Sequence, residues 1–317
     1  MSNLDFTICC TVTFFSKKRR TLPNLNNGMY YPHFVIKGTE EYLGINFIDG
    51  EDVILKNQET AKDFIIQFSK TIFKVFRSFE GALDFKVKGY IVSDSLILYS
   101  NDSSKEALVN LIEVVETICR DEYIKNGILI RGGISKGDFV KIKASELPNL
   151  EKALIVGKSY VKAYELEGAN KVIGINLSKE VYLDILEYDN QLDRKSTNWP
   201  KFKSQAIKYG KKKDTYYLFK YITLDFLLKD NNLSQFVKLA NQSNWLEHYY
   251  NTLSFALQKE RGSKKKKELF VKIVQIISES KENSLDLFIE NAFKDGVEKR
   301  FKTYFLKHIG KTLLGKI

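Results

Sequence analysis

Three short motifs rich in carboxylates, glycines and basic side chains follow one another between residues 90 and 167 of this 317-residue chain. They read YIVSDS at 90–95, IRGGISKG at 130–137 and GKSYVKAYELE at 157–167. Carboxylate oxygens are the ligands that Mg²⁺ prefers, and lysine and arginine neutralise the charge of phosphate groups. The motifs therefore favour chemistry on a polyanion, for which a nucleoside triphosphate is one candidate.

The elements that must position these motifs are strands and helices in alternation. Residues 6–15, 33–37 and 42–48 are rich in β-branched and aromatic types and predict strands. Phenylalanine and isoleucine at helical spacing predict a helix over 60–79. The elements expected next are a central strand at 85–98, a helix from Ser104 to Cys119, strands at 128–134 and 153–156, a helix at 159–167 and a strand at 172–175. This order predicts an α/β sandwich with helices packed on a sheet.

Beyond Leu192 the pattern becomes mainly helical, after one expected strand at 215–221. The helices expected there cover 224–228, 245–257, 269–278 and 285–314. We therefore divide the chain into an N-terminal β extension (1–41), a central domain (42–192) and a mainly helical C-terminal region (193–317).

Composition excludes several classes of protein. With 44% hydrophobic and 28% charged residues, the chain can bury enough apolar surface to fold, which excludes a disordered protein. Its apolar runs are far shorter than the roughly 20 residues that span a bilayer, and no signal peptide is recognisable. Three cysteines, two of them adjacent, exclude a disulfide framework or a CxxC zinc site, so we expect a cytoplasmic protein.

The net charge of +11 could indicate nucleic-acid binding. Much of the excess, however, lies in two lysine runs, 211–213 and 264–267, in predicted loops. We interpret these runs as solvated surface and expect neither nucleic acid nor a membrane as a partner. The alternative is that they attract a polyanion, which a nucleoside triphosphate would satisfy as well as a nucleic acid.

The three motifs together resemble the catalytic domain of class III nucleotidyl cyclases, in the divergent bacterial form with an SDS strand, an RGGI(S)xG strand and a GxxxxxAYELE helix. The resemblance implies an α+β sandwich on a central, mostly antiparallel sheet. It also implies two aspartates on adjacent strands that bind two Mg²⁺ or Mn²⁺ ions at the triphosphate.

Asp94 matches the second of these aspartates, and Asp49, in INFIDG at 45–50, is the best candidate for the first. Gly50 and Glu51 depart from the family pattern after Asp49. Each aspartate also has a structural interpretation. Asp49 could close a β-hairpin, because Asp-Gly is a turn signal, and Asp94 could accept backbone N–H groups at a strand end.

Two positions that read the base in purine cyclases are occupied by Tyr90 and Leu154. A tyrosine there resembles the pyrimidine cyclases of bacterial anti-phage signalling, the Pycsar enzymes, which make cyclic CMP or cyclic UMP. A phenol fills the space that a smaller pyrimidine leaves and offers one hydroxyl to its polar edge. The alternative is that Tyr90 is an ordinary strand aromatic.

The family's transition-state Asn and Arg are replaced by Val161 and Glu165, and a glutamate cannot neutralise a phosphorane. Lys162, Arg131 or Lys136 could supply the missing charge, Lys162 and Arg131 in catalysis and Lys136 in nucleotide binding. Lys162 could equally be a solvated helix lysine. Because class III sites form between two domains and this chain has one copy, the resemblance implies a homodimer.

A second resemblance competes over a short segment. Residues 28–48 are similar to the β-barrel segment of elongation factor Tu-like domains, with GYRPHF followed by YLGxxFID. In that case Asp49 belongs to a barrel turn, and the domain binds nucleotide without turnover. We interpret His33, in the same segment, as a structural histidine.

The sequence thus predicts a homodimeric nucleotidyl cyclase that converts UTP or CTP, rather than ATP, into a 3′,5′-cyclic nucleotide for anti-phage signalling. The alternative is a non-catalytic, cyclase-like module whose helical tail and basic loops engage a partner protein or nucleic acid.

Overall fold

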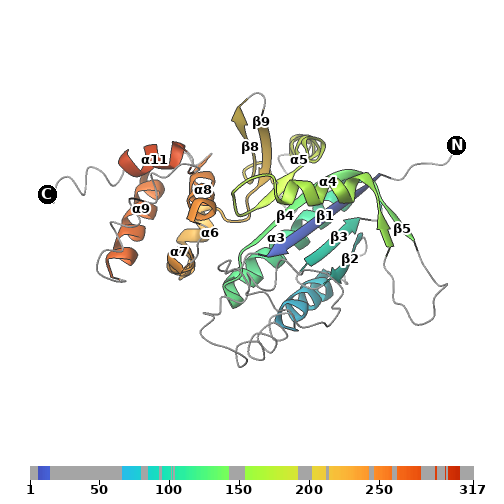
Figure 1. Cartoon of the computed structure of the whole chain (residues 1–317), viewed down its shortest axis with the longest axis horizontal. Helices are drawn as coiled ribbons and strands as arrows, with labels where there is room; N and C mark the ends of the chain where they lie inside the picture. Colours follow the sequence, from blue (N-terminus) through green and yellow to red (C-terminus); the bar gives the residue numbers. More distant parts are fainter. Residues whose placement is uncertain are drawn as a thin grey trace, which may run out of the picture.

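The structure is a computed structural model of the whole chain (Figure 1). The residues that it describes are 6–14, 66–79, 85–92, 95–100, 102, 104–142, 154–191, 202–211, 214–242, 246–258, 263–279, 290, 297 and 299–307.

A mixed sheet organises the described residues. Its strands, from one edge to the other, are β2 (Val87–Val92), β3 (Ser95–Ser100), β1 (Phe6–Phe14), β4 (Ile130–Asp138), β7 (Ile175–Leu177), β9 (Asp214–Phe219) and β8 (Ala206–Lys211). Neighbours pair antiparallel except β4 and β7, which are parallel. A separate two-stranded sheet pairs β5 (Val140–Ile142) with β6 (Leu154–Val156).

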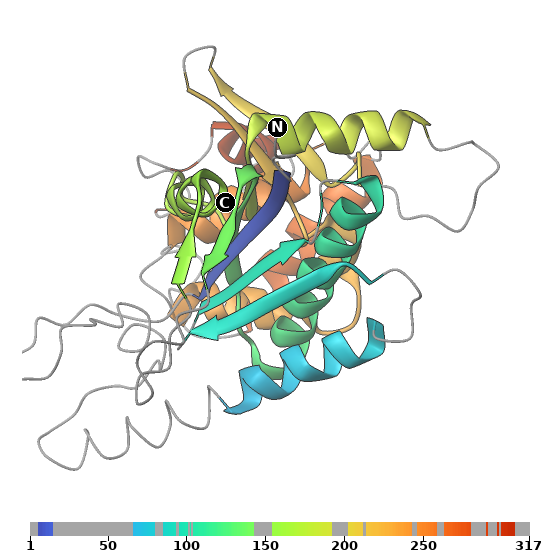
Figure 2. The same cartoon turned by 90° about the vertical axis from the view of Figure 1, so that its right-hand side faces the viewer.

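Helices cover both faces of the main sheet. The described helices are residues 66–79, α3 (Lys105–Asn126), α4 (Lys158–Glu167), α5 (Lys179–Gln191), α6 (Leu224–Leu228), α7 (Asn232–Gln242), α8 (Leu246–Ala256), α9 (Ser263–Ser278) and α11 (Lys299–Phe305). Figure 2 shows α4 on one face of the sheet, and α3 with helix 66–79 on the other. Helices α6, α7, α8, α9 and α11 form a layer beside the sheet (Figure 1). The predicted α/β fold, with a mostly antiparallel sheet and a helical C-terminal part, is confirmed.

The helix α3 illustrates how the sequence sets the elements. The Ser104 hydroxyl accepts the N–H of Ala107 and caps the start of the helix, and Gly127 ends it with φ of 67°. Its inner face buries Leu108, Leu111, Ile112 and Val115, as their spacing predicts, although the helix extends beyond the expected end at Cys119.

The helix α4 lies directly on β4 because Gly133 has no side chain. A Cβ atom at Gly133 would lie 2.0 Å from the carbonyl oxygen of Ala163. Ser135 and Ser159 add polar contacts between the same elements, since the Ser135 hydroxyl donates to the Ser159 carbonyl and the Ser159 hydroxyl donates to Asp138. The glycine of the RGGIS motif therefore serves helix–sheet packing.

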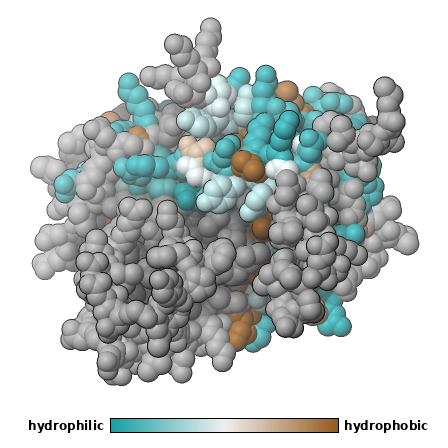
Figure 3. Space-filling view, turned by 45° about the vertical axis from the view of Figure 1, so that its right-hand side comes forward, coloured by the Kyte–Doolittle hydropathy of each residue, from teal (hydrophilic) through white to brown (hydrophobic). Residues whose placement is uncertain are grey.

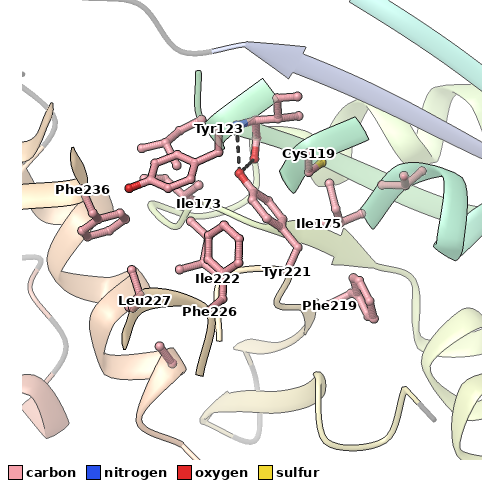
Figure 4. Close-up of a cluster of buried hydrophobic side chains, with 14 of the residues drawn as sticks. Cys119, Tyr123, Ile173, Ile175, Phe219, Tyr221, Ile222, Phe226, Leu227 and Phe236 are labelled. Atoms are coloured by element: carbon pink, nitrogen blue, oxygen red, sulfur yellow. Dashed lines mark hydrogen bonds between the residues drawn. The ribbon is translucent and has the colours of Figure 1, made fainter. Parts of the chain in front are cut away.

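Tyr221 joins the end of the sheet to the helical layer. It is fully buried, and its hydroxyl donates to the carbonyl of Ile130 (2.7 Å) and accepts the N–H of the same residue (2.9 Å), as Figure 4 shows. Burial of this group without partners would be costly, so the two hydrogen bonds fix where β4 begins. Lys220, also buried, donates to the carbonyls of Phe255 and Gln258 at the end of α8.

The predicted domain boundaries separate strands that the structure joins in one sheet. Strand β1, assigned to an N-terminal extension ending at residue 41, lies between β3 and β4. Strands β8 and β9, assigned to the C-terminal region beginning at residue 193, extend the sheet beyond β7. Sequence periodicity cannot detect either arrangement, because strand neighbours distant in sequence leave no local signal.

Several individual elements also differ from expectation. The predicted single strand 85–98 is a hairpin of β2 and β3, and β5, β8, α5 and α7 were not predicted. The strands expected at 33–37 and 42–48 and the start of the helix expected at 60–79 lie outside the described residues.

None of the described helices combines the length and apolar composition needed to cross a membrane.

On the face shown in Figure 3, the coloured residues are mostly hydrophilic, with a few hydrophobic ones between them.

Candidate functional site

The candidate site lies at one end of the sheet, where β3 begins, β1 ends and β4 begins. Val12 of β1 pairs with Leu96 of β3 on one side and with Gly132 of β4 on the other. Neighbouring strands are about 4.8 Å apart, so the start of β3 lies roughly 10 Å from the start of β4. The first two of the three motifs therefore meet across a single intervening strand.

The predicted metal ligands, Asp49 and Asp94, both lie outside the described residues. In the sequence, Asp94 falls between the end of β2 at Val92 and the start of β3 at Ser95. Strand β1, between β3 and β4, contains no aspartate or glutamate. Within the described ranges, no group of three or more His, Cys, Asp or Glu residues could hold a metal ion. The two-ion site therefore stays a prediction from the sequence.

Arg131, one of the predicted catalytic cations, forms an ion pair with Glu167 at the end of α4. Their side chains are 19% and 10% exposed, respectively. Burial raises the pKa of Glu167, and the neighbouring guanidinium opposes that shift. The pair joins the second motif to the third, and Glu167 neutralises an arginine that would otherwise be available to phosphate.

The helical layer reaches this ion pair through His248 of α8. The imidazole is buried, and burial together with the charges of Arg131 and Lys171 lowers its pKa to about 3. Two further residues of α8 bind Lys171, which lies between α4 and β7. Glu247 forms an ion pair with the Lys171 side chain, and the Asn251 amide donates to the Lys171 carbonyl. His248 is therefore neutral near pH 7.

We expect this histidine to make the protein less stable in mild acid. Because the folded pKa of about 3 is below the ordinary 6.5, the unfolded chain binds the extra proton first as the pH falls. The contribution of His248 to the free energy of unfolding is therefore fully present above about pH 6.5. Below that pH it falls by about 1.4 kcal/mol per pH unit, which amounts to about 2 kcal/mol at pH 5. Urea unfolding of wild type and His248→Gln between pH 7 and pH 5 measures this contribution. Equal pH slopes for the two proteins would contradict the prediction.

The two predicted lysines of the site pair with the first half of α5. Lys162 lies 3.0 Å from Glu180, and Lys136 lies 2.8 Å from Asp184. Hydrogen bonds from its own backbone N–H, from Lys162 and from Ser178 lower the pKa of Glu180 to about 2. The Lys162 pair is exposed and contributes little to stability, so a phosphate could displace Glu180 at low cost, whereas the Lys136 pair is partly buried.

The two lysines do not lie at the same place on the sheet. Lys136 pairs with Ile8 and lies four residues beyond Gly132 along β4, a distance of roughly 13 Å. Lys162 lies on α4, which contacts β4, β1 and β7 of the sheet. The structure thus brings Arg131 to the end of the sheet where β3 begins, and places Lys136 farther along the strand.

Tyr90, the predicted base-reading residue, belongs to a stack of aromatic rings. It stacks on Tyr99 with centroids 5.8 Å apart, and Tyr99 stacks on Phe139 at 4.7 Å. Burial and the adjacent Tyr90 hydroxyl raise the pKa of Tyr99 to about 12. Gly89 and Ile91 face helix 66–79, so Tyr90 points to the face of the sheet that carries α4.

Leu154, the other predicted base-reading residue, lies in β6 opposite Ile142. Its side chain is outside the described part of the structure. The two departures from the family pattern, Val161 and Glu165, lie on the exposed side of α4, and Val161 is 53% exposed.

The sequence did not indicate the acidic partners of these cations. Glu180 and Asp184 belong to α5, whose buried Val181, Ile185 and Tyr188 follow the i, i+4, i+7 spacing of an amphipathic helix. This apolar spacing is the sequence signal from which α5, and with it the positions of Glu180 and Asp184, could have been predicted.

No protein-family model and no curated protein matches this chain. Among solved structures it is similar to that of a bacterial light-regulated adenylyl cyclase, with a TM-score of 0.37 and 8% sequence identity, over 69% of this chain and 92% of that one.

Proposed function

We propose that this protein is a nucleotidyl cyclase that forms a 3′,5′-cyclic pyrimidine nucleotide from UTP or CTP. The observation that carries the proposal is the convergence of the three motifs. Strand β3, which follows Asp94, and strand β4, which carries Arg131, both pair with β1, and the helix that ends at Glu167 contacts β1 and β4, although the motifs span residues 90 to 167.

In the proposed reaction the ribose 3′-hydroxyl attacks the α-phosphorus. A bond forms between that oxygen and phosphorus, the bond to the β-phosphate bridging oxygen breaks, pyrophosphate leaves and the hydroxyl proton passes to solvent. Asp49 and Asp94 are the proposed ligands of Mg²⁺ or Mn²⁺, which would supply charge neutralisation at the triphosphate when bound.

The roles proposed for the other residues differ in how readily the structure allows them. Lys162 can turn to a phosphate because its ion pair is solvent-accessible. Lys136 is the proposed nucleotide contact that the structure allows less readily, because its pair is partly buried and it points to the other face of β4 from Arg131. Arg131 would have to leave a buried pair with Glu167, so we assign it to positioning the start of β4. Tyr90 and Leu154 are the proposed contacts of the base.

A pyrimidine is proposed over a purine because of Tyr90. Its ring is already part of an aromatic stack with Tyr99, on the face of the sheet that carries α4. An aromatic side chain at this position leaves less room for a base than the lysine of the purine cyclases, and it offers a stacking surface. The homodimer and the role in anti-phage signalling are proposed on the resemblance to the pyrimidine cyclases.

One observation favours a second function, a cyclase-like module that binds nucleotide without turnover. Each of the three cations Arg131, Lys136 and Lys162 pairs with a carboxylate of this chain. A site in which these pairs stay closed would lack the positive charge that stabilises a phosphorane.

Incubation of the purified protein with each of the four ribonucleoside triphosphates and Mn²⁺, followed by mass detection of products, tests the proposal. We expect cyclic UMP or cyclic CMP from wild type and none from Asp94→Ala, with equal melting temperatures for the two proteins. A purine product would refute the base assignment and retain the cyclase. Absence of product from folded wild-type protein would favour the module without turnover.

A further inference from the structure

An apolar groove of about 740 Å³ lies between helix 66–79 and the hairpin of β2 and β3. Helix 66–79 forms one wall, and β2 and β3 form the other. The residues that line it are Ile66, Ser69, Lys70, Ile72, Phe73, Phe76, Gly89, Ile91 and Leu96. This groove is on the opposite face of the sheet from α4 and Tyr90, so it is separate from the proposed nucleotide site.

The groove runs along an edge of the sheet. Strand β2 pairs with β3 on one side, and none of the other described strands pairs with its second side. An edge strand directs the N–H and C=O groups of every second residue away from the sheet, where they can pair with a further strand. Beside this edge, Phe73 is 66% exposed, Ile91 42% and Ile66 38%.

Basic side chains surround the groove. Lys70, Lys74 and Arg77 project from helix 66–79 on the groove side, whereas Lys88 of β2 projects, like Tyr90, from the other face of the same edge strand; all four are exposed. Between residues 66 and 79 there is no acidic residue. Within the described residues, these four cations form no ion pair. The helix side of the groove therefore carries positive charge, whereas most of the residues that line the groove are apolar.

Gly89 keeps the floor open. A Cβ atom there would lie 2.6 Å from Cδ2 of Leu98 and 2.9 Å from the carbonyl oxygen of Ile97. Because glycine occupies the position, β2 presents Ile91 to the groove without a bulky neighbour two residues before it.

We propose that this groove binds an extended, acidic segment of a partner protein, added as a strand beside β2. The backbone of the segment would pair with the free edge of β2, and its alternate apolar side chains would enter the groove against Phe73 and Ile91. Its acidic side chains, which alternate with the apolar ones, would lie on the other face near Lys88, within the positive field that Lys70, Lys74 and Arg77 add to.

Charge and chemistry select this occupant over two others. A second copy of the chain at this groove would bring the same basic side chains against these, and the like charges would repel. A nucleic acid would satisfy the cations, but its phosphate backbone would leave the apolar floor exposed. An acidic strand with apolar side chains matches both features.

A fluorescein-labelled peptide of eight residues, in which glutamate alternates with valine or phenylalanine, is the probe. We would measure its binding to the full chain by fluorescence anisotropy, beside the same peptide with lysine in place of glutamate. The groove variant Phe73→Glu/Lys74→Glu should weaken binding at least tenfold. The matched control Val271→Glu/Lys267→Glu, at exposed positions on α9, should leave it unchanged.

A milder variant, Lys70→Ser/Lys74→Ser, keeps the test valid if the first variant does not fold, and should weaken binding severalfold. Hydrogen exchange of the β2 amides should slow when the acidic peptide is bound. Equal binding of the lysine peptide, unchanged binding to both groove variants, or displacement of the peptide by a single-stranded RNA at equal concentration would each overturn the proposal. None of these measurements depends on cyclase activity.

Discussion

Replacing Glu167 with alanine is expected to lower the free energy of unfolding by about 3–5 kcal/mol. The substitution leaves the largely buried Arg131 without the carboxylate that neutralises it, close to the buried His248. Desolvation of the charge is then no longer offset, and the contact between β4 and α4 is weakened. Urea unfolding at pH 7 measures the loss.

Glu165→Ala is the matched control, two residues away on the exposed side of α4, and should cost less than about 0.5 kcal/mol. Rescue distinguishes a charge effect from a packing effect. The double variant Arg131→Met/Glu167→Leu should recover most of the stability, because an apolar pair of similar volume replaces a buried ion pair at little net cost. Similar losses for Glu167→Ala and Glu165→Ala would contradict the interpretation of the pair as buried and structural.

Replacing Gly133 with alanine is expected to lower the free energy of unfolding by about 3 kcal/mol. The new methyl group would lie 2.0 Å from the Ala163 oxygen and 2.9 Å from the Leu166 Cβ atom. The first of these atoms belongs to the backbone of α4, so no change of side-chain rotamer relieves the contact, and the helix must move away from β4.

Gly168→Ala is the control for this prediction, since no atom lies within 4 Å of a Cβ at that position and its φ is −83°. It should leave stability within about 0.5 kcal/mol of wild type, or raise it slightly. Thermal and urea unfolding of the two alanine variants compare the sites directly. A loss at Gly133 no larger than at Gly168 would show that α4 does not rest on β4 as described.

The local elements were predictable where one residue pattern dominates. The inner face of α3 follows from Leu108, Leu111, Ile112 and Val115, and β9 from its high content of aromatic and β-branched residues. The hairpin of β2 and β3 was read as one strand because Ser93 and Asp94, between two apolar runs, are a weak turn signal beside Asn-Gly or Asp-Gly. In β8, Gly210 interrupts the alternation, and the strand was missed.

The candidate site was less predictable than the elements because its electrostatics depend on residues far away in sequence. Arg131, Lys136 and Lys162 were identified from their motifs, but Glu167, Asp184 and Glu180 neutralise them from other elements. A motif shows which charges are present. Only the packing of α4 and α5 against the sheet shows which charges are already paired.

The central position of β1 also determines how this protein can fold. Its two neighbours, β3 and β4, are synthesised long after it, and no strand close to it in sequence pairs with it among the described residues. During synthesis, β1 therefore stays unpaired with β4 until β4 has left the ribosome. Pairing these two strands closes the long stretch of chain between them, which is a slow, non-local step. The adjacent hairpin of β2 and β3 can form first, and the apolar strand Phe6–Phe14 is the segment most in need of chaperone protection in the meantime.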